Sequence, residues 1–427
     1  MSLSLGIDIG TSGIRTAVID DAGTVVSMAR AAHLPQDPDR IDAEHWWTAV
    51  RTCLVTQVAR LRAAGQSPAD IAAIAVDGTS GTMVLTDANL APVTRALMYN
   101  SKGFEAEAAR IAEHAPPTHI TRGSSSALAR AMRLRSEDTD NRAAHLLHQA
   151  DFIAAKLMGV GCGSDHNNAL KTGFDPETGR WPDWIGAVFP TNLLPDPAPV
   201  GALFGSIDPA LATSLGLSPT THIHAGTTDS IAAFLAASPV RAGHAVTSIG
   251  STLAIKLLST QRIDAPEIGL YSHRLGDQWL IGGASNTGGA VLAHFFTPDD
   301  LERLTPQIRT DRPTGLDYYP LIKAGERFPV NDPDLQPCLS PRPDDDVVFL
   351  QGLLEGIADI EARCYAEIAA RGGGDPVHIF SAGGAAKNTA LLQMRQARLP
   401  ASVSVTEDTE AAIGAARCTM LTGSSGP

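Results

Sequence analysis

A short apolar run that ends in an acidic residue and a glycine-rich turn is the feature that most constrains the fold. Leu3–Asp8 predicts a buried strand, Gly10-Thr11-Ser12-Gly13 a tight turn, and Ile14–Asp20 a second strand. A further turn leads into a third strand, Thr24–Arg30. Three strands joined by short turns form a meander. The spacing is neither that of a Walker A loop nor that of a dinucleotide fingerprint, so neither of those mechanisms is predicted.

The next segments extend this meander into an α/β pattern. Asp42–Leu61 carries apolar residues at helical spacing, and Ile71–Val76 predicts another buried strand. That strand runs into the small, polar string Asp77-Gly78-Thr79-Ser80-Gly81-Thr82. His145 and His148 are expected on a helix, as packing or surface residues. The order of three strands, a helix and a strand indicates an α/β domain.

A related pattern opens the second half of the chain. Ala245–Ile249 and Leu253–Leu258 predict two strands joined by the turn Gly250-Ser251-Thr252. A long helical stretch, Asp346–Ala370, precedes a strand at Val377–Ser381. The two halves of the chain repeat the order of predicted elements, but they show no obvious repeat in amino-acid sequence. We therefore expect two domains, 1–236 and 237–427, with the last helix able to pack back on the first.

Composition excludes several classes of protein. The chain has 427 residues, 44% hydrophobic and 19% charged, which is typical of a globular protein. Its net charge of -13 argues against nucleic acid as a partner. The five cysteines are scattered without a Cys-x-x-Cys pair, which argues against a disulfide framework and a zinc site. No apolar run approaches the roughly 20 residues of a membrane span, and no secretory signal is evident, so we expect a cytoplasmic protein.

The two glycine-rich turns predict phosphate binding. Small residues let backbone N–H groups approach an anion, and Thr11 and Ser12 add hydroxyl donors. Asp8, at a strand end, could hold a hydrated Mg²⁺ beside the phosphates. An ordinary hairpin with a capping Asp is the alternative for either turn alone. Two such turns, one in each half, suggest that they bind one phosphate chain.

Two further motifs stand at strand-to-helix junctions. Gly383-Gly384-Ala385-Ala386-Lys387-Asn388 lies between a strand and the predicted helix Thr389–Arg398, where small residues could accept a flat adenine. Asp229 lies at the junction between a short strand and the predicted helix Ile231–Ala237. It is either an N-cap or a general base, and phosphoryl transfer needs a carboxylate to accept the proton of the attacking hydroxyl.

Together these motifs resemble the FGGY carbohydrate kinases, within the actin–sugar kinase–Hsp70 superfamily. The resemblance covers nearly the whole chain, because the motifs occur in the family's order and spacing. It implies an α/β fold of two ribonuclease H-like (actin-like ATPase) domains around a central cleft. It also implies a monomer or homodimer that acts on a small-molecule sugar with ATP and Mg²⁺.

The resemblance also assigns roles to residues. Asp229 would be the general base, Asp8 would hold Mg²⁺ through water, and Thr11 would contact the γ-phosphate. The nucleotide would be bound by Gly10, Thr11, Ser12, Gly13, Gly250, Ser251, Thr252, Gly383, Gly384, Lys387 and Asn388. The sugar would be bound by Ser80, Asn100, Lys102, Asp229 and Ser230, with Asp165 and Lys171 as further candidates.

Departures from the family pattern narrow the range of expected substrates. Many members carry Trp-x-Asp-x-Arg where this chain has Met98-Tyr99-Asn100-Ser101-Lys102. Glycerol kinases carry Gln-Arg-Glu, and xylulokinases Met-His-Gly, where this chain has the string that follows Asp77. The chain is closer to compact xylulokinase-like enzymes of cyanobacteria and plants that favour D-ribulose. This implies a ketopentose 5-kinase, with D-xylulose or another sugar or polyol, or a non-catalytic sugar- or nucleotide-binding regulator, as alternatives.

Overall fold

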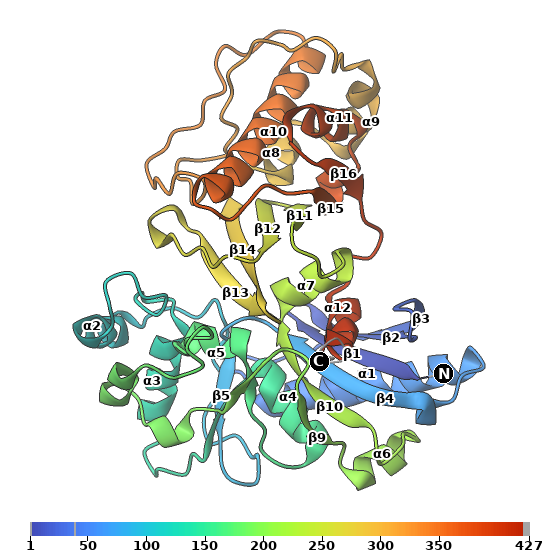
Figure 1. The fold of residues 1–427 in the computed structure, drawn as a ribbon, viewed down its shortest axis with the longest axis vertical. Coiled ribbons are helices and arrows are strands. Elements are labelled where there is room, and N and C mark those ends of the chain that lie inside the picture. Colours follow the sequence, from blue (N-terminus) through green and yellow to red (C-terminus); the bar gives the residue numbers. More distant parts are fainter. Residues whose placement is uncertain (1, 38–39, 422–427) are drawn as a thin grey trace. The chain divides into compact units, whose positions relative to one another are not determined.

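The chain forms a mixed α/β structure with two six-stranded sheets, each in its own compact unit (Figure 1). The structure is a computed structural model that describes residues 2–37 and 40–421. The first unit comprises the chain through Ala236 together with the segment from Glu410, and the second comprises Ala237–Thr409. The mixed α/β architecture predicted from the sequence is confirmed.

The first unit holds a sheet with the order β3-β2-β1-β4-β10-β9. Its strands, with those of two small sheets, are β1 (Leu3–Gly10), β2 (Gly13–Ile19), β3 (Val25–Ala31), β4 (Ile71–Gly78), β5 (Met83–Thr86), β6 (His145–His148), β7 (Ser164–Asp165), β8 (Pro197–Ala198), β9 (Leu203–Ser206) and β10 (His222–Thr228). Its helices are α1 (Ala43–Ala63), α2 (Glu105–His114), α3 (Ala127–Glu137), α4 (Gln149–Met158), α5 (His166–Thr172), α6 (Pro209–Leu215), α7 (Asp229–Ala237) and α12 (Ala411–Cys418).

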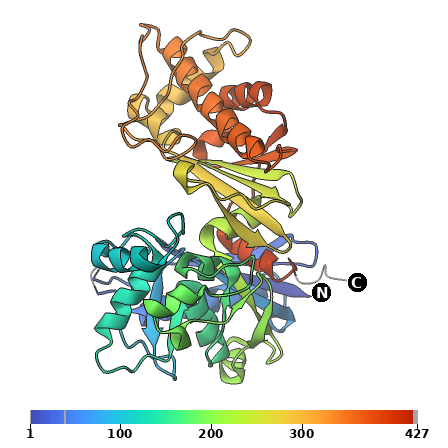
Figure 2. The ribbon, with the colours of Figure 1, turned by 60° about the vertical axis from the view of Figure 1, so that its left-hand side comes forward.

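The second unit repeats this topology in a sheet with the order β13-β14-β12-β11-β15-β16. Its strands are β11 (His244–Ile249), β12 (Leu253–Ser259), β13 (Tyr271–Leu275), β14 (Gln278–Ser285), β15 (His378–Ala382) and β16 (Ser402–Val405). Its helices are α8 (Gly289–Phe295), α9 (Pro298–Leu304), α10 (Asp346–Ala370) and α11 (Thr389–Arg398), and α10 and α11 lie side by side (Figure 2). Both sheets contain three antiparallel strands, β1–β3 in the first and β11, β12 and β14 in the second, followed by two parallel ones, β4 and β10 or β15 and β16. Each sheet has one more antiparallel edge strand, β9 beside β10 in the first and β13 beside β14 in the second.

Local sequence explains why α1 forms where it does. The side chain of Asp42 caps the helix by accepting a hydrogen bond from the backbone N–H of Glu44 at 2.9 Å. Trp46, Val50 and Leu54 recur at helical spacing and are buried against the first sheet. The helix thereby covers the face of β1 that carries its odd-numbered apolar residues.

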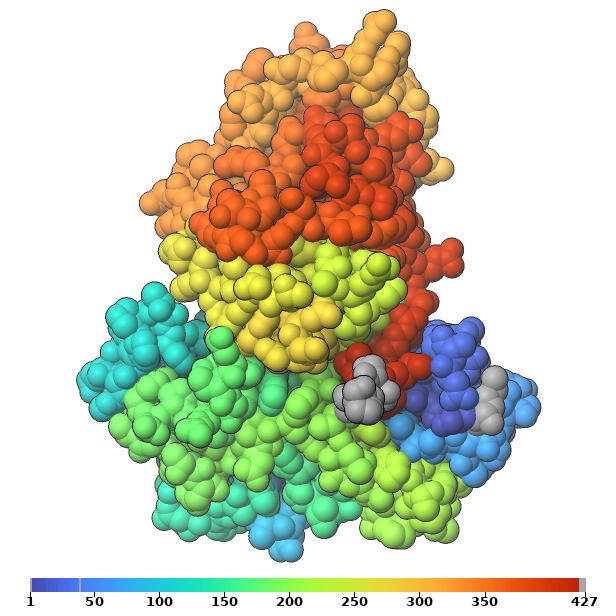
Figure 3. All heavy atoms as spheres, in the orientation of Figure 1, coloured from blue at the N-terminus to red at the C-terminus, as the bar shows by residue number. Residues whose placement is uncertain are grey.

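The opposite face of the first sheet is covered by α12, from the end of the chain. Figure 3 shows its dark red residues beside the blue residues of the first strands. A Cβ at Gly6 would lie 1.9 Å from the carbonyl oxygen of Ala412, so glycine is required for this close approach. The even-numbered residues of β1, Asp8 included, therefore point to the side of the sheet where α12 packs.

One sequence expectation about an element is wrong. His145 and His148 lie on strand β6, which pairs antiparallel with β5, and not on a helix. His148 is fully buried, and its Nδ1 lies 2.8 Å from Oδ2 of Asp151 at the start of α4. None of the helices within residues 2–37 and 40–421 is long and apolar enough to cross a membrane.

Candidate active site

The first glycine-rich turn joins β1 to β2 and is braced by an arginine that the sequence reasoning missed. Nη1 of Arg15 lies 3.2 Å from Oδ2 of Asp8, and its Nη2 donates to Oγ of Ser12 at 3.0 Å. Its Nε lies 3.3 Å from Oε2 of Glu410, which directly precedes α12. Arg15 thus ties the Asp8 carboxylate to the turn and to the C-terminal segment. Thr11 and Ser12 are exposed at the tip of the turn.

A second carboxylate, Asp77, lies next to Asp8. The two residues are register partners on the adjacent parallel strands β1 and β4. Asp77 is completely buried, and no donor in the described residues reaches either of its carboxylate oxygens. Burial raises the pKa of Asp77 well above its usual value, and the charges of Asp8 and Asp229 raise it further. The signal in the sequence was a carboxylate at the end of a buried strand, as at Asp8.

Asp229 is the first residue of α7, directly after β10. Its Oδ1 accepts a hydrogen bond from the backbone N–H of Ser230 at 2.6 Å. Asp229 is partly exposed and Ser230 is exposed. The first unit therefore gathers Asp8, Asp77 and Asp229 at the carboxyl ends of three neighbouring strands, where ligands of open α/β sheets bind.

Ser80 lies on the loop after β4, which two buried side chains hold in place. The Oε1 of Gln149 accepts from the backbone N–H of Thr79 at 3.0 Å. Nε of Arg130 donates to the Gly81 carbonyl at 2.9 Å, and burial lowers the pKa of this arginine to about 10. The hydroxyl oxygen of Ser80 is buried and has no partner in the described residues. Hydrogen bonds from two buried side chains therefore anchor the loop, and its Ser80 hydroxyl has no partner within the described residues.

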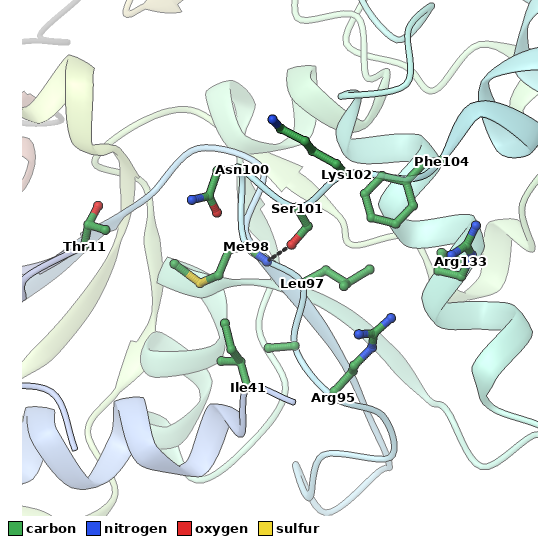
Figure 4. Close-up of a pocket in the computed structure, with 11 residues that line it drawn as sticks. Thr11, Ile41, Arg95, Leu97, Met98, Asn100, Ser101, Lys102, Phe104 and Arg133 are labelled. Atoms are coloured by element: carbon green, nitrogen blue, oxygen red, sulfur yellow. Dashed lines mark hydrogen bonds between the residues drawn. The ribbon is translucent and has the colours of Figure 1, made fainter. Parts of the chain in front are cut away.

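Asn100 and Lys102 line a pocket of about 440 Å³ that also reaches Thr11 (Figure 4). The other residues that line it are Ile41, Arg95, Ala96, Leu97, Met98, Ser101, Phe104 and Arg133. Arg133 is paired with Glu107 at 2.6 Å and Arg95 with Glu137 at 2.8 Å. Lys102 is exposed, and no carboxylate in the described residues pairs with it. Ser80, Asp229 and Ser230 do not line this pocket, so it gathers part of the predicted sugar set only.

In the second unit the two predicted nucleotide motifs are neighbours. The turn Gly250–Thr252 joins β11 to β12, and the Gly250 carbonyl accepts from the N–H of Gly289 at 2.7 Å. Gly383, at the end of β15, has a φ of +91°, and a Cβ there would lie 2.5 Å from the Ile249 carbonyl oxygen. The glycine-rich motif that begins at Gly383 thus packs directly against the start of the turn.

Within that motif, the side chain of Asn388 is hydrogen-bonded to other parts of the second unit, whereas that of Lys387 is exposed. Oδ1 of Asn388 accepts from the Leu391 N–H at 2.9 Å as the N-cap of α11, and its Nδ2 donates to Oγ1 of Thr305 at 2.9 Å. Asn388 therefore has a structural role that the sequence reasoning did not assign. Lys387 is exposed, and so is Gly384, where a side chain would meet open space.

The strand edge beside Asp8 suits a divalent cation. Burial raises the pKa of Asp8, with Asp77 and Arg15 acting in the opposite direction. The unpartnered oxygens of Asp77 are hard donors of the type that Mg²⁺ prefers. The donor set at this edge therefore fits the ion that accompanies nucleotide phosphates.

Comparison with known proteins identifies the family. Residues 3–236 match the N-terminal domain, and residues 245–422 the C-terminal domain, of the FGGY family of carbohydrate kinases. The chain belongs to the FGGY carbohydrate kinases. It is thus a sugar kinase, an enzyme that transfers a phosphoryl group to a small-molecule sugar, and the family uses ATP, typically with a divalent metal.

The relatives within this family are named for different substrates. The chain is 23% identical to a xylulose kinase of Staphylococcus epidermidis over 92% of this chain and 82% of that one. It is 24% identical to a gluconokinase of Bacillus subtilis over 78% of this chain and 70% of that one. These identities are similar, so they do not decide the substrate.

Solved structures of FGGY kinases share the fold. A xylulose kinase from Rhodospirillum rubrum superposes with a TM-score of 0.83 at 20% identity, covering 100% of this chain and 91% of that one. The glycerol kinase of Plasmodium falciparum with ADP superposes with a TM-score of 0.84 at 16% identity, covering 98% and 89%. This agreement concerns the fold alone.

Proposed function

We propose that this FGGY kinase transfers the γ-phosphoryl group of ATP to the terminal hydroxyl of a ketopentose, with D-ribulose as the first candidate and D-xylulose as the second. The product would be the ketopentose 5-phosphate, formed in the cytoplasm. The observation that carries the proposal is the gathering of Asp8, Asp77 and Asp229 at adjacent strand ends, beside a loop with an unused Ser80 hydroxyl.

The proposed chemistry uses Asp229 as the general base. Its carboxylate accepts the proton of the attacking hydroxyl, a new O–P bond forms to the γ-phosphorus, and the bond to ADP breaks. Asp229 suits this role because it is partly exposed, whereas Asp77 has no solvent contact. General-base help contributes about 10²–10⁴ in rate.

The nucleotide would be held by both glycine-rich turns. Thr11, with Gly10, Ser12 and Gly13, would bind the phosphates from the first unit, and Gly250, Ser251 and Thr252 from the second. The adenosine would lie against Gly383, Gly384, Lys387 and Asn388. Asp8 would hold Mg²⁺ through water, and the ion would supply positive charge that stabilises the transferring phosphoryl group.

The choice of a ketopentose is supported by the loop after β4. A buried hydroxyl without a partner, that of Ser80, is suited to a hydrogen bond with a sugar hydroxyl. Asn100, Lys102, Asp229 and Ser230 complete the proposed sugar set. The short side chains of Thr79–Thr82 replace the longer ones that glycerol kinases and xylulokinases carry at this place, which favours D-ribulose.

A coupled ADP-release assay tests the proposal. Wild type and Asp229→Asn are supplied with Mg-ATP and a panel of D-ribulose, D-xylulose, glycerol, aldoses and D-gluconate. We expect turnover with a ketopentose, lowered at least about 10²-fold in the variant. Asn keeps the shape of Asp, so we expect the variant to fold. Thermal unfolding of both proteins checks this. Turnover that is equal in both enzymes would exclude Asp229 as the base, and a protein that binds sugar without turnover would be a regulator.

One observation favours a second candidate, a sugar acid. Lys102 lines the pocket of Figure 4 without a carboxylate partner in the described residues, and a lysine can pair with a substrate carboxylate. A gluconokinase is among the relatives. Preference for D-gluconate in the same panel, lost in Lys102→Met but kept for neutral sugars, would favour this candidate over a ketopentose.

A further inference from the structure

Asp77 is a buried carboxylate whose place in the sheet is fixed. It lies on β4 opposite Asp8 of β1, and register partners on parallel strands point to the same side of a sheet. β1 and β4 run side by side in Figure 1. Asp77 has no exposed surface, and both of its oxygens lack a hydrogen-bond donor within the described residues. Apart from the neighbouring carboxyl of Asp8, its side chain therefore has no partner within the described residues that explains why a charge-bearing group is buried here.

The surroundings of Asp77 increase the cost of that burial. β10 pairs with β4 on the other side, with Thr227 opposite Asp77, and Asp229 follows two residues later. The positive charge that contacts Asp8 is Arg15, and it is shared with Glu410. A buried carboxylate without a donor, between two further carboxylates, is strongly unfavourable unless a cation or a proton neutralises it.

We propose that Asp77 supplies a second carboxylate, beside that of Asp8, to a divalent-cation site. The inference rests on the proposed function, in which the cation accompanies ATP. Mg²⁺ is typically bound by one or two carboxylates together with substrate phosphates, and carboxylates behind the first ligand orient it and its waters. Because Asp77 is on a strand and not on a loop, its carboxylate is held in place before the cation arrives.

Binding of Mn²⁺, a paramagnetic substitute for Mg²⁺, tests this role without any turnover. Electron paramagnetic resonance measures free Mn²⁺ during titration of wild type and Asp77→Asn, each with and without ADP. Asp138→Asn is the matched control, because Asp138 is also buried but accepts hydrogen bonds from the N–H groups of Arg142 and Ala143. A second readout is the rise in Tm that MgCl₂ produces.

We expect Asp77→Asn to bind Mn²⁺ about 10–100-fold more weakly than wild type, and Asp138→Asn to match wild type. Without a divalent cation the Tm of Asp77→Asn should equal or exceed that of wild type, because the unpartnered charge is gone. Mn²⁺ affinity equal in wild type and Asp77→Asn, or no binding by wild type, would overturn the proposal.

A fallback variant and a comparison with the activity assay separate failure of the cation site from failure of the proposed function. If Asp77→Asn does not fold, Asp77→Ser, which is smaller and also neutral, is titrated in its place with the same expectation. If wild type shows no sugar-dependent ADP release but binds Mn²⁺ in an Asp77-dependent way, the proposed function fails and the cation site stands. If it phosphorylates a sugar while Asp77→Asn binds Mn²⁺ normally, only the role of Asp77 fails.

Discussion

Arg395 and Glu361 form a two-point ion pair with no solvent exposure on either side chain, with Nε–Oε2 at 2.5 Å and Nη2–Oε1 at 2.8 Å. Glu361 lies on α10 and Arg395 on α11. Oε1 of Glu361 also accepts from Thr247 of β11, and Nη1 of Arg395 donates to Ser381 of β15. The pair therefore supports the two strands that lead to Gly250–Thr252 and Gly383.

Glu361→Gln should destabilise the protein severely, because it leaves the Arg395 guanidinium buried without a counter-charge. Breaking a buried pair in this way costs about 3–5 kcal/mol. Asp359→Asn, which breaks the partly exposed pair between Asp359 and Arg398, should cost about 1 kcal/mol or less. Chemical denaturation of both variants measures the difference. Equal losses of unfolding free energy in the two variants would contradict the prediction that the buried ion pair matters more than the exposed one.

Arg15 should be needed for activity beyond its effect on stability. Arg15→Met removes the contacts of the guanidinium with Asp8, Ser12 and Glu410. We expect kcat/KM for ATP to fall about 10-fold or more, since a group misplaced by about 1 Å can cost up to about 10²-fold in rate. Arg30→Met is the control, because Arg30 contacts the same Glu410 from an exposed position. If the two variants lose activity equally, the Asp8 contact is not the cause.

Gly383→Ala should weaken nucleotide binding. The residue has a φ of +91°, and a methyl group would lie 2.5 Å from the Ile249 carbonyl oxygen, so the backbone must move. The strain costs about 1–3 kcal/mol in unfolding free energy, and the displaced turn Gly250–Thr252 should raise KM for ATP. Gly384→Ala meets open space and should change the unfolding free energy little. Thermal unfolding and initial rates distinguish the two variants.

Local patterns predicted much of the fold. α10 and α11 have the predicted bounds, Asp346–Ala370 and Thr389–Arg398, because apolar periodicity and capping act within one segment. The helix expected at His145 and His148 is a strand because its pairing partner, β5, is 59 to 65 residues earlier in the chain. Such pairing outweighs short-range propensity and is invisible in a single segment.

The site shows the same division between local and long-range information. Asp8 and Asp229 stand in motifs, so their residue types and neighbours were enough to predict a role for each, and these roles stay predictions. Asp77 and Arg15 were missed because their significance depends on partners across strands and on Glu410, close to the end of the sequence. Burial without a partner, the property that marks Asp77, exists only in the folded chain.

Asp165 should make stability depend on pH. Its carboxylate caps α5, accepting from the N–H groups of Asn167 and Asn168, yet burial and the charge of Asp151 raise its pKa from 3.8 to about 7. The native protein therefore holds a proton here that the unfolded chain has released. Where the native state binds more protons, the unfolding free energy falls as pH rises, in this case between about pH 4 and pH 7.

Asp165→Asn removes this titration and keeps an oxygen that can cap the helix. The variant should therefore gain stability relative to wild type by about 2 kcal/mol or more between pH 5 and pH 8. Urea unfolding at both pH values measures the gain. Asp208→Asn controls for capping, since Asp208 caps α6 by accepting from the N–H of Leu211 at 2.8 Å. A stability difference between Asp165→Asn and wild type that is the same at pH 5 and pH 8 would show that Asp165 is ionised in the native protein.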